Sequence, residues 1–175
     1  QSDLEIRLQE LIAETGGSPT MVTLEITEGL LLEPSPRIMA TLQAIRDLGF
    51  QIALDDFGTG FSSLSYLVEY RFDKLKIDRS FVSAISQAGS AQTVVQAVIR
   101  LGHALGMEVV AEGVETVTDS VTMRFWGSDH LQGYFFSRPL PAEELIAFIG
   151  SYNSSSVALQ FDEASNLLQS NGSLG

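Results

Sequence analysis

The stretch Ile52-Ala53-Leu54-Asp55-Asp56-Phe57-Gly58-Thr59-Gly60-Phe61-Ser62-Ser63 ends an apolar run in two adjacent carboxylates and continues into a glycine-rich segment. The apolar run is typical of a buried strand, and the glycines indicate a turn directly after it. Adjacent Asp side chains repel each other, so a divalent cation that offsets the repulsion would explain the pair. An ordinary solvated turn explains it as well, since Asp and Gly are common turn residues. The pair alone leaves both interpretations open.

Strand-like runs and helical patterns alternate along the rest of the chain. Strands are predicted at Val22-Thr27, Gln51-Asp56, Lys74-Asp78, Glu108-Gly113 and Asp129-Tyr134. Helices are predicted at residues 3–14, 36–48, 62–70, 90–105, 116–125 and 142–149. Because strands and helices alternate, the repeating unit is βα and the sheet should be parallel.

One face of the predicted strands collects polar side chains near the strand ends, namely Glu25, Asp55, Lys76, Glu112 and Gln132. Residues two positions apart in a strand share a face, so the apolar residues between them face the other way, towards the helices. A polar, helix-free face is natural in a closed barrel, where it lines the mouth. The fold class is therefore predicted as α/β, a TIM-type (β/α)8 barrel.

The predicted barrel is incomplete in this chain. A full (β/α)8 barrel usually needs ~250 residues, whereas the chain has 175 and shows about five of the eight βα units. We assign residues 1–149 to the partial barrel and residues 150–175 to a polar tail, in which residues 157–168 have the weakly amphipathic pattern of a short helix. The chain begins without Met, so we expect that it was cut from something longer.

The composition excludes several classes of function. The formal net charge of -12 would repel a nucleic-acid polymer and an anionic membrane surface, so neither is expected as a partner. The chain has no cysteine, which excludes thiolate metal sites and a cysteine nucleophile and leaves oxygen ligands. No apolar run reaches the ~18 to 20 residues that cross a bilayer, and the expected location is the cytoplasm.

Five motifs in order give the chain its resemblance to a known family. They are Leu24-Glu25-Ile26-Thr27-Glu28, the run from Asp55 to Ser63, Leu75-Lys76-Ile77-Asp78, Ala111-Glu112-Gly113-Val114-Glu115-Thr116, and Gln132-Gly133-Tyr134 followed by Arg138-Pro139-Leu140-Pro141. Over Met21 to Ile149 the chain resembles the EAL-domain family, bacterial phosphodiesterases that open cyclic di-GMP to the linear dinucleotide pGpG.

The resemblance implies a role for each matching residue. It makes Glu25, Asp55, Asp56 and Gln132 ligands of two Mg²⁺ or Mn²⁺ ions, with Asp55 bridging the two ions. Lys76 would hold the attacking water, and the catalytic set would be Lys76, Glu112 and Glu25. Glu28 would anchor the loop that starts at Phe57. Glu115 would support the metal ligands without binding the metal itself. The residues close to the substrate would be Asp78, Gln132 and Pro139.

The resemblance also implies partners. Besides cyclic di-GMP, these are a second copy in a homodimer and an upstream sensor or GGDEF-type domain in the parent chain. The loop from Gly58 to Ser63 resembles the segment that couples metal binding and dimerisation to activity.

The match departs from the family at its amino-terminal end. The Glu-Ala-Leu motif that names the family has no counterpart here, nor has the Asn ligand on the following strand or the motif's substrate-binding Arg. Three hypotheses therefore stay open. The chain is the carboxyl-terminal part of a competent phosphodiesterase, a degenerate module that binds cyclic di-GMP or a protein partner without turnover, or a structural dimerisation piece.

Other motifs have simpler explanations. Asp56-Phe57-Gly58 matches a magnesium-binding tripeptide of protein kinases, but no His-Arg-Asp loop accompanies it. Gly58-Thr59-Gly60 is more typical of a tight turn than of a phosphate cradle. His103 and His130 are expected to be structural, hydrogen-bonded residues.

Overall fold

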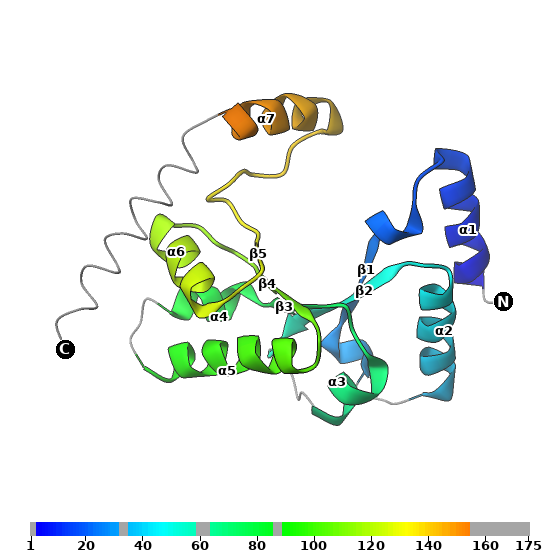
Figure 1. The fold of residues 1–175 in the computed structure, drawn as a ribbon, viewed down its shortest axis with the longest axis horizontal. Coiled ribbons are helices and arrows are strands. Elements are labelled where there is room, and N and C mark those ends of the chain that lie inside the picture. Colours follow the sequence, from blue (N-terminus) through cyan, green and yellow to red (C-terminus); the bar gives the residue numbers. More distant parts are fainter. Residues whose placement is uncertain (1–2, 32–34, 59–63, 86–88, 155–175) are drawn as a thin grey trace.

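Five parallel strands form the centre of the protein, which is described by a computed structural model over residues 3–31, 35–58, 64–85 and 89–154. The strands are β1 (Thr23–Thr27), β2 (Gln51–Phe57), β3 (Lys74–Ile77), β4 (Glu108–Ala111) and β5 (His130–Leu131). They pair in chain order, each parallel to the next (Figure 1). The predicted series of parallel βα units is confirmed.

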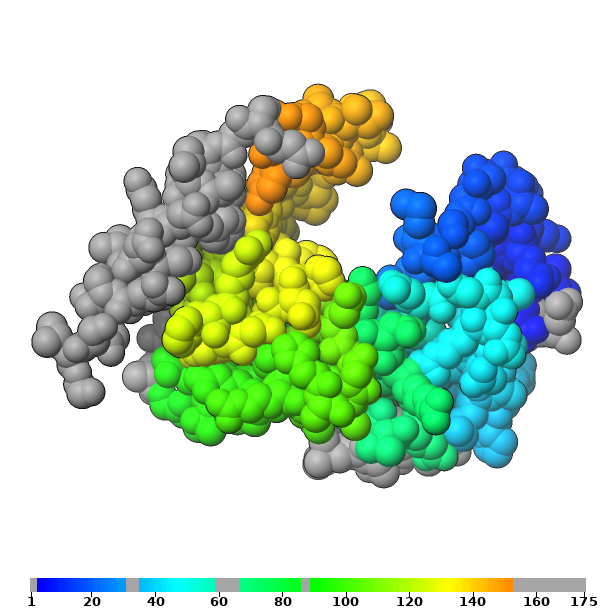
Figure 2. Space-filling view, viewed as in Figure 1, coloured from blue at the N-terminus to red at the C-terminus, as the bar shows by residue number. Residues whose placement is uncertain are grey.

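Helices connect the strands and flank the sheet. They are α1 (Asp3–Thr15), α2 (Pro36–Asp47), α3 (Leu64–Tyr70), α4 (Arg79–Ala84), α5 (Ser90–Ala104), α6 (Val117–Trp126) and α7 (Ala142–Ser154), with short 3-10 turns η1 (Pro19–Met21) and η2 (Glu28–Leu31). Helix α2 contacts β2, and α5 contacts β3 and β4. Figure 2 shows the molecule hollowed between α7 and α1, on the side of the sheet opposite α2, α3 and α5. Among the helices of the described ranges, none is long and apolar enough to span a membrane.

Local sequence signals explain where the connecting helices begin. At α2, Ser35 caps the helix by accepting a hydrogen bond from the Arg37 N–H, and Pro36 occupies the first turn, where its missing N–H costs nothing. At α6, Thr116 and Asp119 exchange side-chain and backbone hydrogen bonds in a capping box. These caps fix where α2 and α6 begin after β1 and β4 have ended.

The core lies between the sheet and the helices that cover its outer face. Ile52 and Leu54 of β2, and Leu75 and Ile77 of β3, are almost completely buried. Full burial of such a side chain stabilises the fold by about 1.5–3 kcal/mol relative to exposure. Because these residues are two positions apart, the intervening residues of each strand face the other side, which confirms the predicted alternation.

Two aspartates join neighbouring strands at the amino-terminal end of the sheet. Asp73, just before β3, accepts a hydrogen bond from the Ile52 N–H of β2 at 2.8 Å. Asp129, just before β5, accepts one from the Val109 N–H of β4 at 2.7 Å, and its carboxylate also meets His103 Nε2 at 2.9 Å. Both Asp residues therefore fix the register of adjacent strands at the amino-terminal end of the sheet, opposite the predicted site.

The elements differ from the prediction mainly at their ends. β3, β4 and β5 stop before Asp78, Glu112 and Gln132, so these three residues lie in loops directly after the strands. The unpredicted helix α4 begins because the Asp78 side chain caps it at the Ser80 N–H. The last helix was predicted to end at Ile149 but continues to Ser154. The predicted tail helix at residues 157–168 lies outside the described residues.

We expect Asp129→Ala to lower the free energy of unfolding by roughly 1–2 kcal/mol at pH 7, because a backbone donor and His103 lose a charged acceptor. Urea unfolding followed by circular dichroism measures this, with Glu69→Ala at an exposed position of α3 as the control. Equal stability of Asp129→Ala and wild type would contradict the assigned role.

The contribution of Asp129 to the free energy of unfolding should also depend on pH. Burial alone raises the pKa of Asp129, but the hydrogen bonds from Val109 and His103 outweigh burial and lower that pKa. A carboxylate with a depressed pKa in the folded state stabilises the fold above its unfolded pKa of about 3.9, and the stabilisation is lost as the pH falls through the folded value. The difference between wild type and Asp129→Ala should therefore narrow below about pH 4.

Candidate metal centre at the carboxyl ends of the strands

Three predicted polar residues, each on or directly after a different strand, meet around one lysine. Lys76 Nζ lies 2.7 Å from Glu25 Oε1, 3.0 Å from Asp55 Oδ1 and 2.8 Å from Glu112 Oε1. Glu25 comes from β1, Asp55 from β2, Lys76 from β3, and Glu112 directly follows β4. The parallel sheet brings these side chains together because the carboxyl ends of its strands lie at the same edge.

An irregularity in β2 turns both aspartates towards this cluster. Consecutive side chains of a regular strand point to opposite faces, so Asp55 and Asp56 would normally diverge. The pairing of β2 with β3 shifts register between Leu54 and Phe57, and Asp56 has a positive φ of 57°. Asp tolerates this left-handed conformation better than most residues, which explains its presence at this position. The residue pattern alone does not predict this irregularity.

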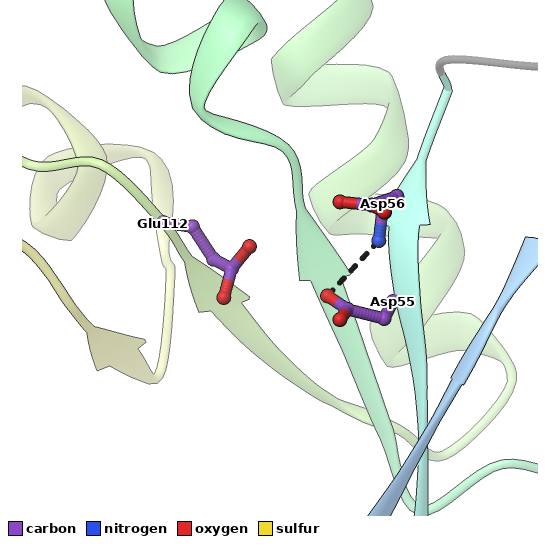
Figure 3. A group of neighbouring side chains, drawn as sticks. All are labelled: Asp55, Asp56 and Glu112. Atoms are coloured by element: carbon purple, nitrogen blue, oxygen red, sulfur yellow. Dashed lines mark hydrogen bonds between the residues drawn. The ribbon is translucent and has the colours of Figure 1, made fainter.

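Three carboxylates have the spacing of a metal site. Asp55, Asp56 and Glu112 each offer an oxygen, and these oxygens all lie within 4.8 Å of one another. Figure 3 shows the two aspartates of β2 and the glutamate after β4 turned towards the same space, with the Asp56 N–H donating to Asp55 Oδ1 at 3.0 Å. An all-oxygen donor set of this kind fits Mg²⁺ or Mn²⁺.

The other two predicted ligands lie beside this trio. Glu25 contacts Lys76 and is about half exposed, on the strand at the end of the described sheet. Gln132 follows β5 and lines a cavity of about 300 Å³ together with Asp56 and Glu112. The structure thus brings Asp55, Asp56 and Glu112 into one group, with Glu25 joined to it through Lys76 and Gln132 on the wall of the adjoining cavity.

Charges in the cluster perturb the pKa values of its members. Burial lowers the pKa of Lys76, whose side chain is 6% exposed, but hydrogen bonds to Glu112, Glu25 and Asp55 outweigh burial and raise the pKa above its ordinary value. Burial raises the pKa of Glu112, while contact with Lys76 opposes this change. Lys76 is therefore a permanent cation among carboxylates at neutral pH.

Close contacts between loops fix the positions of Glu112 and Gln132. A Cβ at Gly113, which has a φ of 66°, would overlap the side chain of Arg79, and a Cβ at Gly133 would overlap the backbone of Val114. The Val114 N–H donates to the Gln132 carbonyl at 3.0 Å, which links the loops after β4 and β5. Only glycine allows these loops to approach so closely.

The residues predicted to support the site have different environments. Glu28 is buried, and its Oε2 accepts a hydrogen bond from the Gly58 N–H at 3.2 Å, as an anchor of the loop after Phe57 would. Residues 59–63 of that loop lie outside the described ranges. Glu115 is exposed and lines the cavity of about 300 Å³. Asp78 lines it as well and also caps α4.

A second cavity adjoins the first and includes Pro139. It has a volume of about 320 Å³ and shares Gln132, Gly133 and Tyr134 with the first cavity. Its lining includes Arg138, whose guanidinium carbon lies 4.6 Å from the centre of the Tyr134 ring. The motifs assign no role to Arg79, Tyr134 or Arg138, although Tyr134 and Arg138 stand in one of them.

Both histidines contact carboxylates other than Glu25, Asp55, Asp56 and Glu112. His130 Nε2 is 3.2 Å from Glu108 Oε2, at the amino-terminal end of β4, and the same oxygen lies 3.3 Å from Lys74 Nζ. His103 contacts Asp129. Both histidines are therefore structural hydrogen-bonding residues.

Comparison with known proteins identifies the family. The EAL domain family matches residues 1–139. The cyclic di-GMP phosphodiesterase NbdA of Pseudomonas aeruginosa is 36% identical over 152 residues, which are 87% of this chain and 19% of the relative. The chain spans about a fifth of the length of the curated relatives that it matches.

Two solved structures share the fold. The cGMP-bound form of the EAL enzyme Bd1971 superposes with a TM-score of 0.80 at 36% identity, covering 85% of this chain and 40% of that one. BlrP1 of Klebsiella pneumoniae, solved with manganese and cyclic di-GMP, has a TM-score of 0.74 at 36% identity, covering 79% of this chain and 36% of that one. The resemblance, which rests on the motifs, and the partial barrel, which rests on the alternating strands and helices, are both confirmed. The chain belongs to the EAL-domain family, and its five parallel strands form part of that family's βα barrel.

Proposed function

We propose that this chain is the carboxyl-terminal part of a cyclic di-GMP phosphodiesterase domain and carries most of its metal-binding and water-positioning residues. The observation that carries this proposal is the carboxylate cluster around Lys76 at the carboxyl ends of the strands. The name of NbdA and the ligands of BlrP1 support it, because both proteins share the family and more than a third of the aligned residues.

Asp55, Asp56 and Glu112 would hold the divalent ions, and Glu25 and Gln132 would complete their ligands. Two ions, Mg²⁺ or Mn²⁺, would neutralise the phosphodiester and activate a water when bound. An acidic chain with a net charge of -12 can then accept an anionic substrate.

The chain's own residues would bind and orient the substrate around this centre. Lys76, a permanent cation, would orient the attacking water by hydrogen bonding. Arg79 lines the cavity of about 300 Å³ beside Asp56 and Asp78 and would bind a phosphate oxygen. The adjoining cavity offers Tyr134, Arg138 and Pro139 as a surface on which a guanine base could stack. Glu115, at the rim, would support this arrangement.

The parent protein would join this domain to others. The curated relatives are about five times as long as the matched segment, which leaves room for an upstream sensor or GGDEF-type domain. We propose a homodimer in the cytoplasm as the working form. A second candidate function is a module that binds cyclic di-GMP without turnover. The half-exposed Glu25 favours this alternative, because the described sheet places no further strand beside β1.

The first test is hydrolysis of cyclic di-GMP by this chain with Mg²⁺ or Mn²⁺, followed by chromatography of the products. We expect pGpG to form only with metal. Asp55→Asn should reduce its formation by at least about 10- to 100-fold, because this is the loss caused by replacing even a residue that only hydrogen-bonds to a metal ligand. Asp47→Asn, on the exposed end of α2, should retain the activity. A folded chain that binds cyclic di-GMP but forms no product would favour the non-catalytic module.

Metal binding should also be visible without substrate. Mn²⁺ at 100 times its dissociation constant should stabilise the folded chain by about 2.7 kcal/mol, because a ligand that binds only the folded state shifts the unfolding equilibrium. Thermal unfolding with Mn²⁺ or with a chelator measures the shift, which Asp56→Asn should greatly reduce. The same midpoint with and without Mn²⁺ in the wild-type chain would contradict the metal site.

A further inference from the structure

The Lys76 ammonium uses all of its hydrogen-bond donors within the carboxylate cluster. An ammonium group has three N–H donors and no acceptor. Lys76 Nζ has three carboxylate oxygens within 3.0 Å, one each from Glu25, Asp55 and Glu112. Because its side chain is only 6% exposed, bulk water does not compete for these donors. In this arrangement the ammonium has no donor left for a further water or a substrate oxygen.

Two of the carboxylates that bind Lys76 are also candidate ligands of a divalent cation. Asp55 and Glu112 belong both to the group around Lys76 and to the metal-site trio with Asp56. Around Lys76 Nζ, one ammonium is shared by the three carboxylates of Glu25, Asp55 and Glu112, so negative charge exceeds positive charge there. A divalent ion among these oxygens would weaken the attraction of Asp55 and Glu112 to the ammonium and would itself be repelled by it.

We propose that Lys76 is an internal counter-ion that holds the carboxylate cluster together before metal binds, and that a divalent ion replaces it at one or more carboxylates. The released N–H donor then becomes available to a water or a substrate oxygen. This inference rests on the proposed function, because it concerns the same metal centre. It adds that metal binding changes the partners of Lys76. Without metal the lysine positions the ligands, and with metal it donates a hydrogen bond to the reacting groups.

The neighbouring lysine provides an internal control. Lys74 lies two residues earlier on β3, and its ammonium pairs with Glu108 Oε2 at 3.3 Å. Glu108 lies at the amino-terminal end of β4, outside the metal-site trio. Lys74 and Lys76 are the only two lysines in the sequence. A lysine-specific label therefore reports on the proposed counter-ion and on an ordinary ion pair in the same sample.

The first test uses the wild-type chain with ¹⁵N-labelled lysine and follows both ammonium groups by NMR while Mg²⁺ is added. We expect the Lys76 signal to shift or broaden in step with Mg²⁺ binding measured by calorimetry, and the Lys74 signal to stay in place. Mg²⁺ binding that leaves the Lys76 signal unchanged would overturn this inference but not the proposed function. No Mg²⁺ or Mn²⁺ binding at all would overturn both.

The second test compares Mn²⁺ affinity in Lys76→Met and Lys74→Met by calorimetry. Lys76→Met should bind Mn²⁺ at least about tenfold more tightly than wild type, because the ion no longer meets a resident positive charge. Lys74→Met should stay within about twofold of wild type, because its ion pair is partly exposed and outside the cluster.

Equal or weaker Mn²⁺ binding by Lys76→Met would overturn the inference. Without metal, Lys76→Met should unfold at a lower temperature than wild type, and saturating Mn²⁺ should remove most of that difference. A variant that folds only with Mn²⁺ would support the same conclusion. If Lys76→Met folds in neither condition, the NMR titration of the wild-type chain decides, since it needs no substitution.

Discussion

The site requires that the repulsion between carboxylates at the carboxyl ends of the strands be balanced by a cation. Parallel strands deliver Glu25, Asp55 and Glu112 to the same edge, where they would repel one another without a cation between them. Lys76 provides that cation from the strand between Asp55 and Glu112. The sheet order and the charge pattern are therefore linked, because moving β3 to another position would separate the lysine from its partners.

Departures from regular strand geometry shape the site within this frame. The register shift and positive φ at Asp56 allow two consecutive carboxylates to face one space. At Gly113 the loop carrying Glu112 packs against Arg79, and at Gly133 the loop carrying Gln132 packs against the backbone of Val114. At the amino-terminal end, Asp73 joins β2 to β3 ahead of the register shift, and Asp129 joins β4 to β5. The register shift of β2 and these close loop contacts thus lie at the end of the sheet where the chemistry is proposed.

Sequence alone predicted most of the fold, because the signals it used are local. Alternating apolar residues such as Ile52 and Leu54 identify a strand and its buried face without any tertiary information. The convergence of Glu25, Asp55, Lys76 and Glu112 also followed from the parallel order and period two. The orientation of Asp56 could not be predicted in this way, since it depends on how β2 pairs with β3. The short helix α4 was missed although Asp78 and Ser80 carry an N-cap signal, because Lys74-Asp78 was assigned to a strand as a whole.

The acidity of the chain and the charge of its proposed substrate are reconciled by where the charges lie. A net charge of -12 spread evenly over the surface would repel a cyclic dinucleotide. The cluster instead concentrates four carboxylates beside a buried lysine, and Arg79 and Arg138 line the adjoining cavities. Such a site attracts divalent cations first and an anion only afterwards, because the ions reverse the local charge. The order of binding then follows from electrostatics: metal before substrate, with Lys76 changing partners between the two steps.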